Sequence, residues 1–319
     1  MNPFTSTTTS AKGLTMLTSS AARRFAIAAA SVIALAGGTL AVHADTLSQR
    51  VLNHTFQNLV QTPEGPTGGF PVVPMTCAPG VNPCVVDLAA GTGTATVHDS
   101  VNGTQNIPFW GFGVNGQPAG LAGTPSSIIK VMQGTTLTIN LTQDPATGAG
   151  IDLSFPDLSL GAVSHSGNTY TVVADRVGTS LFEPGADSEA PKQISMGLVG
   201  ILIVVPTSCS DATNYACAYT STGYEDEKVV AFGTLDPEFA ANPNTFDMTY
   251  FGQVRTADNK PRRVYHTING KAFPDTDQID MVVGETLLLR YVNASETEVV
   301  PNLLGINQFV LARNDSTYS

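Results

Sequence analysis

Four cysteines are the residues of this chain whose chemistry is most directly indicated by their spacing. They form two close pairs, Cys77 and Cys84 as Cys-x6-Cys, and Cys209 and Cys217 as Cys-x7-Cys. Thiols this close in sequence either close a local disulfide or help to hold zinc. The spacings do not suit the short zinc knuckle, and no histidine lies near either pair. The pattern therefore favours two disulfides, Cys77–Cys84 and Cys209–Cys217.

Histidines could supply metal ligands or proton-transfer groups. The chain has five, at His43, His54, His98, His165 and His266. No two of them stand at a spacing that would let both side chains bind one metal, so we expect surface or turn histidines. The chain also contains no Gly-x-Ser-x-Gly elbow for a nucleophilic serine, and no glycine-rich phosphate loop leading from a strand into a helix.

One aromatic cluster, Phe109-Trp110-Gly111-Phe112, has two interpretations. It holds the only tryptophan of the chain. If exposed, it would form a binding patch, but aromatic side chains within a strand more often belong to the core. We therefore expect these rings to be buried.

The first 44 residues are typical of an export signal. They contain no acidic residue, and Arg23 and Arg24 precede an apolar stretch over residues 25–42. Residues 42–44, Val-His-Ala, have the small-residue pattern of a cleavage site, although the length also allows an uncleaved membrane anchor. The arginine pair is compatible with twin-arginine export of folded cargo. We expect an exported protein, located in the periplasm or the extracellular space.

The mature chain would be strongly acidic. Residues 1–44 carry three basic residues and no acidic one, so their removal changes the net charge from −11 to −14. Such a surface repels phosphate backbones, which argues against a nucleic-acid partner, and it disfavours anionic membranes for the same reason. The most apolar later run, residues 198–205, has the length of a strand and not of a membrane-spanning helix.

Apolar periodicity predicts one helix followed by β structure. Leucine, valine and phenylalanine recur near helical spacing over residues 46–61, and residues 61–82 are rich in proline and glycine, which indicates a loop. From Gly91 onward, short runs of β-forming residues alternate with turn residues. Two such runs flank Gln133-Gly134 in the manner of a hairpin. Strands are expected at 127–132, 135–142, 152–155, 169–174, 179–182 and 198–205.

A second β series follows a polar linker. Its expected hairpin turn is Gly284-Glu285, and its expected strands are 228–235, 264–268, 279–283, 286–292 and 309–312. We predict a signal at 1–44, a helix and disulfide loop at 45–90, a sandwich at 91–206, a linker at 207–224 and an incomplete second sandwich at 225–319.

The second series is too short for a sandwich of about seven strands. One explanation is that the sequence is incomplete, so that a further C-terminal domain is missing. The other is that a partner subunit adds the missing strands at a sheet edge. We favour an incomplete sequence.

Several stretches resemble the first two domains of multicopper oxidases, which are cupredoxin, or plastocyanin-like, domains. NGQPAG (115–120) and PSSIIKVMQGTTLTINLTQ (125–143) resemble the first of these domains, and QISMGLVGILIVVP (193–206) resembles the strand that closes it. TINGKAFPDT (267–276) and VVGETLLLRYVNAS (282–295) resemble the start of the second. The resemblance implies an all-β fold of two tandem cupredoxin-like Greek-key sandwiches, the second incomplete, preceded by a short helix.

The resemblance also implies copper held by imidazole and thiolate. In the family, His-x-His pairs hold the oxygen-reducing cluster, because alternate residues of a strand point to one side. The positions that match these pairs are Asp152 and Ser154 in one strand and Glu183 and Gly185 in another. None is a histidine, and no cysteine stands in a His-Cys-His context. We therefore expect no complete copper site in this chain, and copper is implied by the resemblance alone.

Three functions are compatible with this sequence. The first is a non-catalytic structural or interaction module, which a partner subunit could complete. The second is the N-terminal part, or one subunit, of a copper-dependent oxidoreductase whose copper sites lie outside this chain. The third is a weak module for a divalent cation such as Ca²⁺ or Mn²⁺, bound by Asp152 and Glu183. We favour the first and expect the two carboxylates to be solvated.

Overall fold

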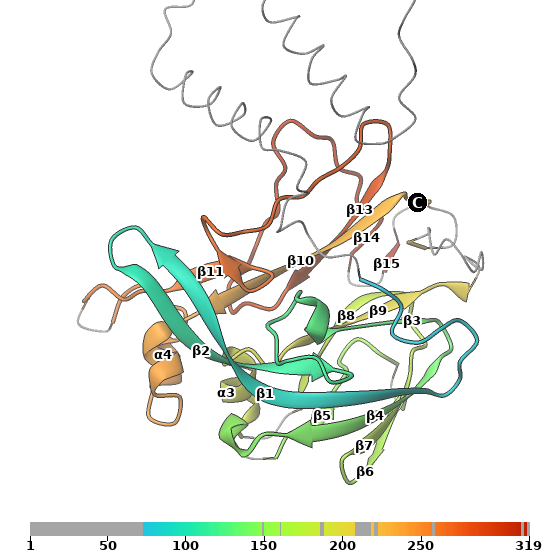
Figure 1. Ribbon diagram of the computed structural model, residues 1–319, viewed down its shortest axis with the longest axis horizontal. Helices are drawn as coiled ribbons and strands as arrows, with labels where there is room; N and C mark the ends of the chain where they lie inside the picture. Colours follow the sequence, from blue (N-terminus) through green and yellow to red (C-terminus); the bar gives the residue numbers. More distant parts are fainter. Residues whose placement is uncertain are drawn as a thin grey trace, which may run out of the picture. The chain divides into compact units, whose positions relative to one another are not determined.

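The computed structural model describes the chain from residue 73 onward, with short gaps (Figure 1). The described residues are 73–148, 150–159, 161–185, 188–207, 218–219, 223–256, 259–313 and 316–317. The description below concerns one compact unit, Gly68–Met281 with Glu285–Ser319. The expected signal, the expected helix at 46–61, His43, His54, Cys209 and Cys217 lie outside the described residues.

The first β series folds into a sandwich of two sheets. One sheet has the strand order β2-β1-β4-β7-β6, and the other has the order β3-β9-β8-β5. Parallel pairs, β1 with β4 and β3 with β9, show that neighbours in space are not always neighbours in sequence. The strands are β1 (Cys84–Asp99), β2 (Gly103–Val114), β3 (Ile128–Met132), β4 (Thr136–Gln143), β5 (Leu153–Ser154), β6 (Val163–Ser166), β7 (Thr169–Val173), β8 (Gly178–Pro184) and β9 (Gly200–Val205).

Short helical turns connect these strands. They are η1 (Pro125–Ser127), η2 (Pro145–Thr147) and α3 (Ala190–Ser195). Each has a proline in its first turn, where the missing backbone N–H costs nothing. Asp144 caps η2, because its side chain accepts a hydrogen bond from the backbone N–H of Ala146.

The second β series forms a single sheet of four strands, in the order β12-β11-β10-β13. Its strands are β10 (Asp226–Leu235), β11 (Tyr265–Ile268), β12 (Lys271–Ala272) and β13 (Leu287–Asn293), with α4 (Pro237–Ala241) and η4 (Met248–Tyr250) between β10 and β11. A small ribbon of β14 (Ala312–Arg313) and β15 (Ser316–Thr317) follows. The expected all-β fold is confirmed for the described residues, in which the first β series forms a sandwich and the second a single sheet.

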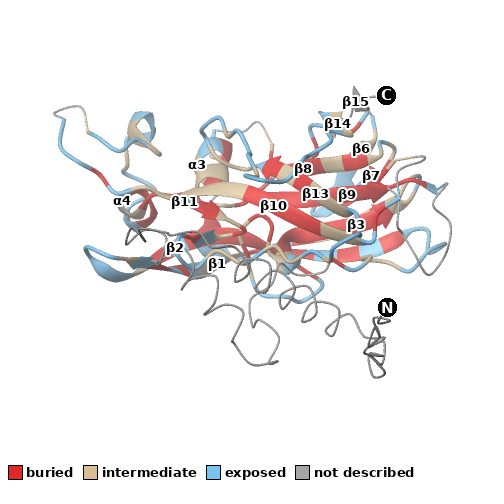
Figure 2. Cartoon of the chain, turned by 90° about the horizontal axis from the view of Figure 1, so that it is seen from above, coloured by how far each residue is buried: buried red, intermediate tan, exposed pale blue. Residues whose placement is uncertain are grey.

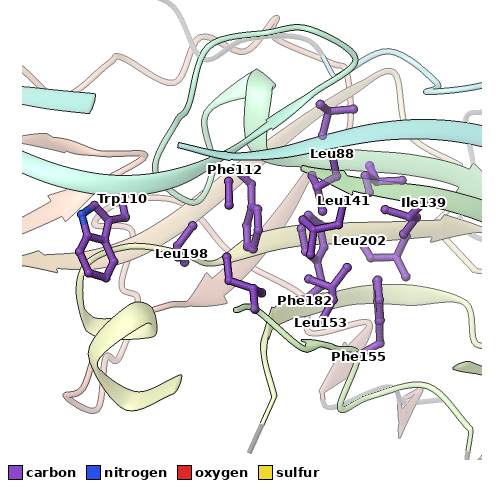
Figure 3. Packing of buried hydrophobic residues seen from close by; sticks show 14 of the residues in the cluster. Leu88, Trp110, Phe112, Ile139, Leu141, Leu153, Phe155, Phe182, Leu198 and Leu202 are labelled. Atoms are coloured by element: carbon purple, nitrogen blue, oxygen red, sulfur yellow. The ribbon is translucent and has the colours of Figure 1, made fainter. Parts of the chain in front are cut away.

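The sandwich core lies between its two sheets (Figure 3). Phe112 and Phe182 pack with ring centroids 5.2 Å apart, and Phe155 lies 5.7 Å from Phe182 on the other side. Trp110 lies at one end of this cluster and is 6% exposed. The aromatic cluster around Trp110 is therefore core, as expected, and not an exposed binding patch.

Strand β9 is buried along its whole length (Figure 2). Leu202 and Val204 belong to the sandwich core, whereas Ile201, Ile203 and Val205 belong to a second cluster on the opposite side. There they pack against apolar residues of β10 and β13, so the second sheet covers the outer face of the sandwich. This explains why the sequence of β9, GILIVV, is apolar throughout instead of alternating.

The long hairpin of β1 and β2 also holds the second series. Ala95, Val97 and Ile107 belong to the same buried cluster as Phe239 of α4 and Ala272 of β12. Two polar contacts reinforce this packing. His98 Nδ1 lies 2.6 Å from Oδ2 of Asp275, and this pair is exposed. The hydroxyl of Tyr265 donates to Oδ2 of Asp99 over 2.8 Å, and this pair is partly buried.

Three charged side chains are buried where the two β series meet. Lys130 of β3 and Arg290 of β13 each donate to a different carboxylate oxygen of Glu227, which lies on β10. Their side chains are 7%, 4% and 9% exposed, respectively. Arg290 also donates from Nη1 to the hydroxyl of Thr179 on β8 over 3.0 Å. Through these two ion pairs, Glu227 of β10 connects β3 of the first β series with β13 of the second.

This glutamate remains ionised. Burial alone raises the pKa of Glu227, but the charges and hydrogen bonds of Arg290 and Lys130 outweigh it, so the net pKa lies below its ordinary value. Burial and the negative charge of Glu227 raise the pKa of the nearby Tyr224 hydroxyl to about 12.

Two expected hairpins are wrong. Strands β3 and β4 lie in different sheets, so the turn at Gln133-Gly134 carries the chain from one sheet to the other. Gly134 has a φ of 81°, which explains the glycine, but a tight turn does not by itself show that its flanking strands pair. Residues 279–283 form no strand, so no hairpin exists at Gly284-Glu285.

Most of the other expected strands are present, with ends that differ from the expected ones by one or two residues. Nine expected strands correspond to β3, β4, β5, β7, β8, β9, β10, β11 and β13. The strand expected at 309–312 is reduced to the two residues of β14, and β structure begins at Cys84, earlier than Gly91. The Cys77–Cys84 disulfide is present. Among the described residues, no helix has the length and apolar character needed to cross a membrane.

The double burial of β9 predicts that the two β series unfold together. Ile203→Ala removes a fully buried side chain from the face that contacts the second sheet, so it should lower the free energy of unfolding by about 2–5 kcal/mol. Denaturation followed by Trp110 fluorescence and by far-ultraviolet circular dichroism should show one shared transition. Val101→Ala, at a side chain 86% exposed, is the control with little effect. Two separate transitions would contradict this prediction.

The buried cluster of Lys130, Glu227 and Arg290 predicts a loss of stability when its carboxylate is removed. Glu227→Gln leaves two buried cations without their carboxylate and should cost about 3–5 kcal/mol. Because the folded-state pKa of Glu227 is lowered, its contribution is present above the unfolded-state pKa and is lost as the pH falls through the lowered value. Denaturant titrations across acidic pH should therefore show a flatter pH dependence in the variant.

The matched control removes all three charges at once. Lys130→Met, Glu227→Leu and Arg290→Met together should recover much of the stability that Glu227→Gln loses, because no uncompensated charge remains buried. If the triple variant were as unstable as the single one, the loss would come from altered packing and not from charge.

Candidate functional site

The four positions that match copper ligands lie in or directly beside two paired strands. Strands β5 and β8 are antiparallel, with Leu153 opposite Pro184 and Ser154 opposite Glu183. Leu153 and Pro184 are buried, and because side chains alternate along a strand, Ser154 and Glu183 fall on the opposite, outer side. Asp152 directly precedes β5 and Gly185 directly follows β8.

This outer side continues into the contact with the second sheet. Further along β8, Leu181 packs against the cluster between the two β series, and Thr179 accepts a hydrogen bond from Arg290. The candidate site is therefore at the open end of a face whose other end is covered. The side chain of Asp152 is 61% exposed, and Glu183 is partly buried.

Tyr170 and His165 surround Asp152. The hydroxyl of Tyr170 lies 3.3 Å from Oδ1 of Asp152 and accepts a hydrogen bond from the backbone N–H of Leu153 over 3.0 Å. Burial, with a further contribution from Asp152, raises the pKa of Tyr170. His165 stacks on Tyr170 with ring centroids 5.2 Å apart, and its Nε2 lies 3.9 Å from Oδ1 of Asp152.

His165 is a neighbour of the site that the sequence analysis did not assign to it. We expected a surface histidine in a turn, and its side chain is indeed 53% exposed. Its position opposite Tyr170 follows from the β6–β7 hairpin, which turns at Gly167 and Asn168. The residues His-Ser-Gly-Asn-Thr-Tyr contain that hairpin signal, and a cross-strand pairing derived from it would have placed the histidine beside Tyr170.

Glu183 stands in an unfavourable environment for a negative charge. Burial raises its pKa, and the negative charges of Asp157 and Glu296 raise it further. Asp157 follows β5, whereas Glu296 comes from the second β series, where it accepts a hydrogen bond from the hydroxyl of Ser195 over 3.3 Å. The face is thus acidic, with contributions from both β series.

The residues of this face do not fit copper. Copper in electron-transfer sites is held mainly by imidazole and thiolate, whereas the four positions offer two carboxylates, one hydroxyl and a glycine. A Cβ atom on Gly185 would stand 3.0 Å from the backbone oxygen of Asp152 and 3.4 Å from its Oδ2, so a larger side chain requires Asp152 to move. No group of three or more potential metal-binding side chains comes together among the residues that the structure describes.

The remaining candidates lie apart from this face. His98 is paired with Asp275, and His266 is exposed on β11. Cys77 and Cys84 are joined to each other with Sγ atoms 2.01 Å apart, so neither supplies a thiolate. A blue-copper ligand set therefore cannot be assembled from these side chains.

No family model and no curated protein matches the chain. Solved structures similar to it include a copper nitrite reductase from Nitrosomonas europaea, with 20% identity over 67% of this chain and 68% of that one and a TM-score of 0.46. A blue copper oxidase from the same organism matches with 19% identity over 66% and 60% and a TM-score of 0.46. A multicopper oxidase from Pseudomonas thermotolerans matches with 18% identity over 67% and 47% and a TM-score of 0.43.

The chain spans three fifths or less of the length of the two oxidases. With identities of 20% or less and TM-scores below 0.5, these likenesses assign neither a family nor a chemistry to this chain.

The acidic face predicts a stabilising substitution. Because the folded-state pKa of Glu183 is raised, its ionisation at neutral pH opposes folding. Glu183→Gln should therefore raise the free energy of unfolding at pH 7, and the gain should vanish as the pH falls below the ordinary glutamate pKa of about 4.3. Denaturant titrations over this pH range measure the effect.

Glu298→Gln, at an exposed position of the second β series, is the matched control. Asp157→Asn should act in the same direction as Glu183→Gln, because it removes one of the charges that repel Glu183. A loss of stability in Glu183→Gln at pH 7 would show that its carboxylate makes a favourable contact.

Proposed function

We propose that this chain is an exported cupredoxin-type module that does not catalyse copper chemistry by itself and acts as a structural or interaction module. The observation that supports this proposal is the pairing of β5 with β8, in which Ser154 is opposite Glu183, Asp152 directly precedes β5 and Gly185 directly follows β8. These are the positions that match the copper ligands of the family, and their donor atoms suit a hard cation or solvent better than copper.

Export is supported by two features. Residues 1–44 have the composition of an export signal, and the Cys77–Cys84 disulfide is typical of proteins that fold in an oxidising compartment. A location in the periplasm or the extracellular space is therefore part of the proposal.

An interaction role is supported by large apolar side chains that remain exposed on the second β series. The second β series forms one sheet whose inner side is covered by β9, while large apolar side chains that follow β13 remain exposed. Monomeric proteins rarely expose extended apolar surface without a binding role. The alternative is that this chain is the N-terminal part, or one subunit, of a copper-dependent oxidoreductase whose copper sites lie outside it.

Copper retention tests whether this chain holds a copper site by itself. The mature chain, incubated with copper and then desalted, should retain far less than one copper per chain when its metal content is measured by mass spectrometry. Asp152→His with Ser154→His rebuilds a His-x-His pair on β5 and should increase retention, because both positions point to the same side.

Stoichiometric copper in the wild-type chain, together with oxygen consumption in the presence of a reductant, would overturn the proposal. Retention of Ca²⁺ or Mn²⁺ that disappears in Asp152→Ala would instead support the weak cation module.

A further inference from the structure

Residues 73–77, which we call the strap, cover the edge of β3 before the chain enters β1 (Figure 1). In the order β3-β9-β8-β5, β3 is the edge strand, and among the described strands it pairs with β9 alone. The backbone N–H of Thr76 donates to the carbonyl oxygen of Lys130 over 2.8 Å. The backbone N–H of Lys130 donates in return to Oγ1 of Thr76, also over 2.8 Å. Thr76 thus satisfies both backbone polar groups of the residue in the middle of this edge strand.

The strap also covers the contact between the two β series. Val73 is 7% exposed and belongs to the buried cluster between β9 and β10, and Met75 packs against the same cluster. The side chain of Lys130, whose backbone bonds to the strap, donates to Glu227 in the same region. A strap that moved away would therefore expose the edge of β3 and one side of this cluster together.

The Cys77–Cys84 disulfide joins the strap to the other sheet of the sandwich. Cys84 is the first residue of β1, in the sheet β2-β1-β4-β7-β6, and it is fully buried. The disulfide therefore runs from a segment bonded to one sheet to a strand of the other. The loop 78–83 between the cysteines is exposed, and Oδ1 of its Asn82 accepts a hydrogen bond from the backbone N–H of Thr136 over 3.0 Å. Such a loop positions the strap less firmly than the covalent bond does.

We propose that the Cys77–Cys84 disulfide is a redox-controlled clasp that holds the strap over the edge of β3. In the oxidised chain, the disulfide keeps Thr76 beside Lys130. Reduction releases the strap, because its hydrogen bonds and the packing of its apolar side chains then have to offset the entropy of ordering an irregular segment by themselves. The edge of β3 is then open to pairing with another strand. This inference does not depend on the proposed function, because it concerns how the strap is held and not whether the chain binds copper.

The reductant that opens the clasp is a dithiol. Its thiolate attacks Sγ of Cys77, which is partly exposed, and the S–S bond breaks as Cys84 leaves as a thiolate and takes up a proton. The second thiol of the reductant then attacks the mixed disulfide, releases Cys77 as a thiol and closes the oxidised reductant. In total, two electrons and two protons pass from the dithiol to Cys77 and Cys84.

Amide hydrogen exchange of the mature chain, with and without dithiothreitol, tests this proposal. Cys209→Ser and Cys217→Ser are combined, so that Cys77 and Cys84 are the only cysteines left. The intact mass of each sample shows whether their disulfide is closed or reduced.

Reduction should accelerate exchange at the backbone amides of Thr76 and Lys130 by at least about tenfold, because both lose their hydrogen-bond partners. Amides of β7 should keep their rates, since β4 separates β7 from β1 in the other sheet. Unchanged exchange at Thr76 and Lys130 would overturn the proposal, because the strap would then stay in place without its disulfide. Equal acceleration in β7 would also overturn it, because the disulfide would then stabilise the whole sandwich and not the strap.

Thr76→Val tests the contact of the strap without a change in redox state. It keeps the disulfide but removes the hydroxyl that accepts from the backbone N–H of Lys130, so this amide should exchange faster in the oxidised chain. Thr94→Val, at an exposed position of β1, is the matched control and should leave the exchange of Lys130 unchanged. If Thr76→Val also left it unchanged, the strap would not protect the edge of β3 and the proposal would be wrong.

Discussion

The burial of β9 on both faces is the constraint on which the other contacts depend. Its side chains pack alternately into the sandwich core and against the second sheet, so neither neighbour can leave without exposing isoleucine or valine to water. Each such side chain contributes about 1.5–3 kcal/mol when it is fully buried. Ile201, Ile203 and Val205 thus hold the second sheet with an energy comparable to the stability of a whole domain. The two β series share their cores for this reason, and the hairpin of β1 and β2 adds a second contact around α4.

The charges of Lys130, Glu227 and Arg290 have a different role in the same contact. Buried ion pairs contribute little net stability, because desolvation offsets their attraction, but a misplaced partner is costly. Hydrophobic packing between β9 and β10 tolerates small shifts, whereas Glu227 has to meet a cation from β3 and another from β13. We infer that the apolar side chains supply the energy of the contact and that the charges select its register.

Local patterns in the sequence predicted the strands better than they predicted the pairing. Alternation and apolar runs located β4, β7 and β9, because these patterns follow from burial on one or both faces of a strand. The partners of β3 and β4 could not be predicted, since the turn at Gln133-Gly134 has the same residues whether its strands pair or separate into two sheets. Much of β1 was missed because its alanines, glycines and threonines carry a weak pattern. The four site positions were identified from the resemblance, whereas His165 reaches Asp152 through pairing across a hairpin.

The position of the candidate site explains how this fold persists without histidines at it. Leu153 and Pro184 face the core and fix the pairing of β5 with β8, whereas Asp152, Ser154 and Glu183 face outward and contribute little to packing. Their identities are therefore free to vary without loss of the sandwich. The inner side of the second sheet is different, because Val229, Ala231 and Val292 pack against β9 there. Polar replacements at these three positions would expose or disrupt the contact between the two β series, so they are constrained in a way that the outward-facing site residues are not.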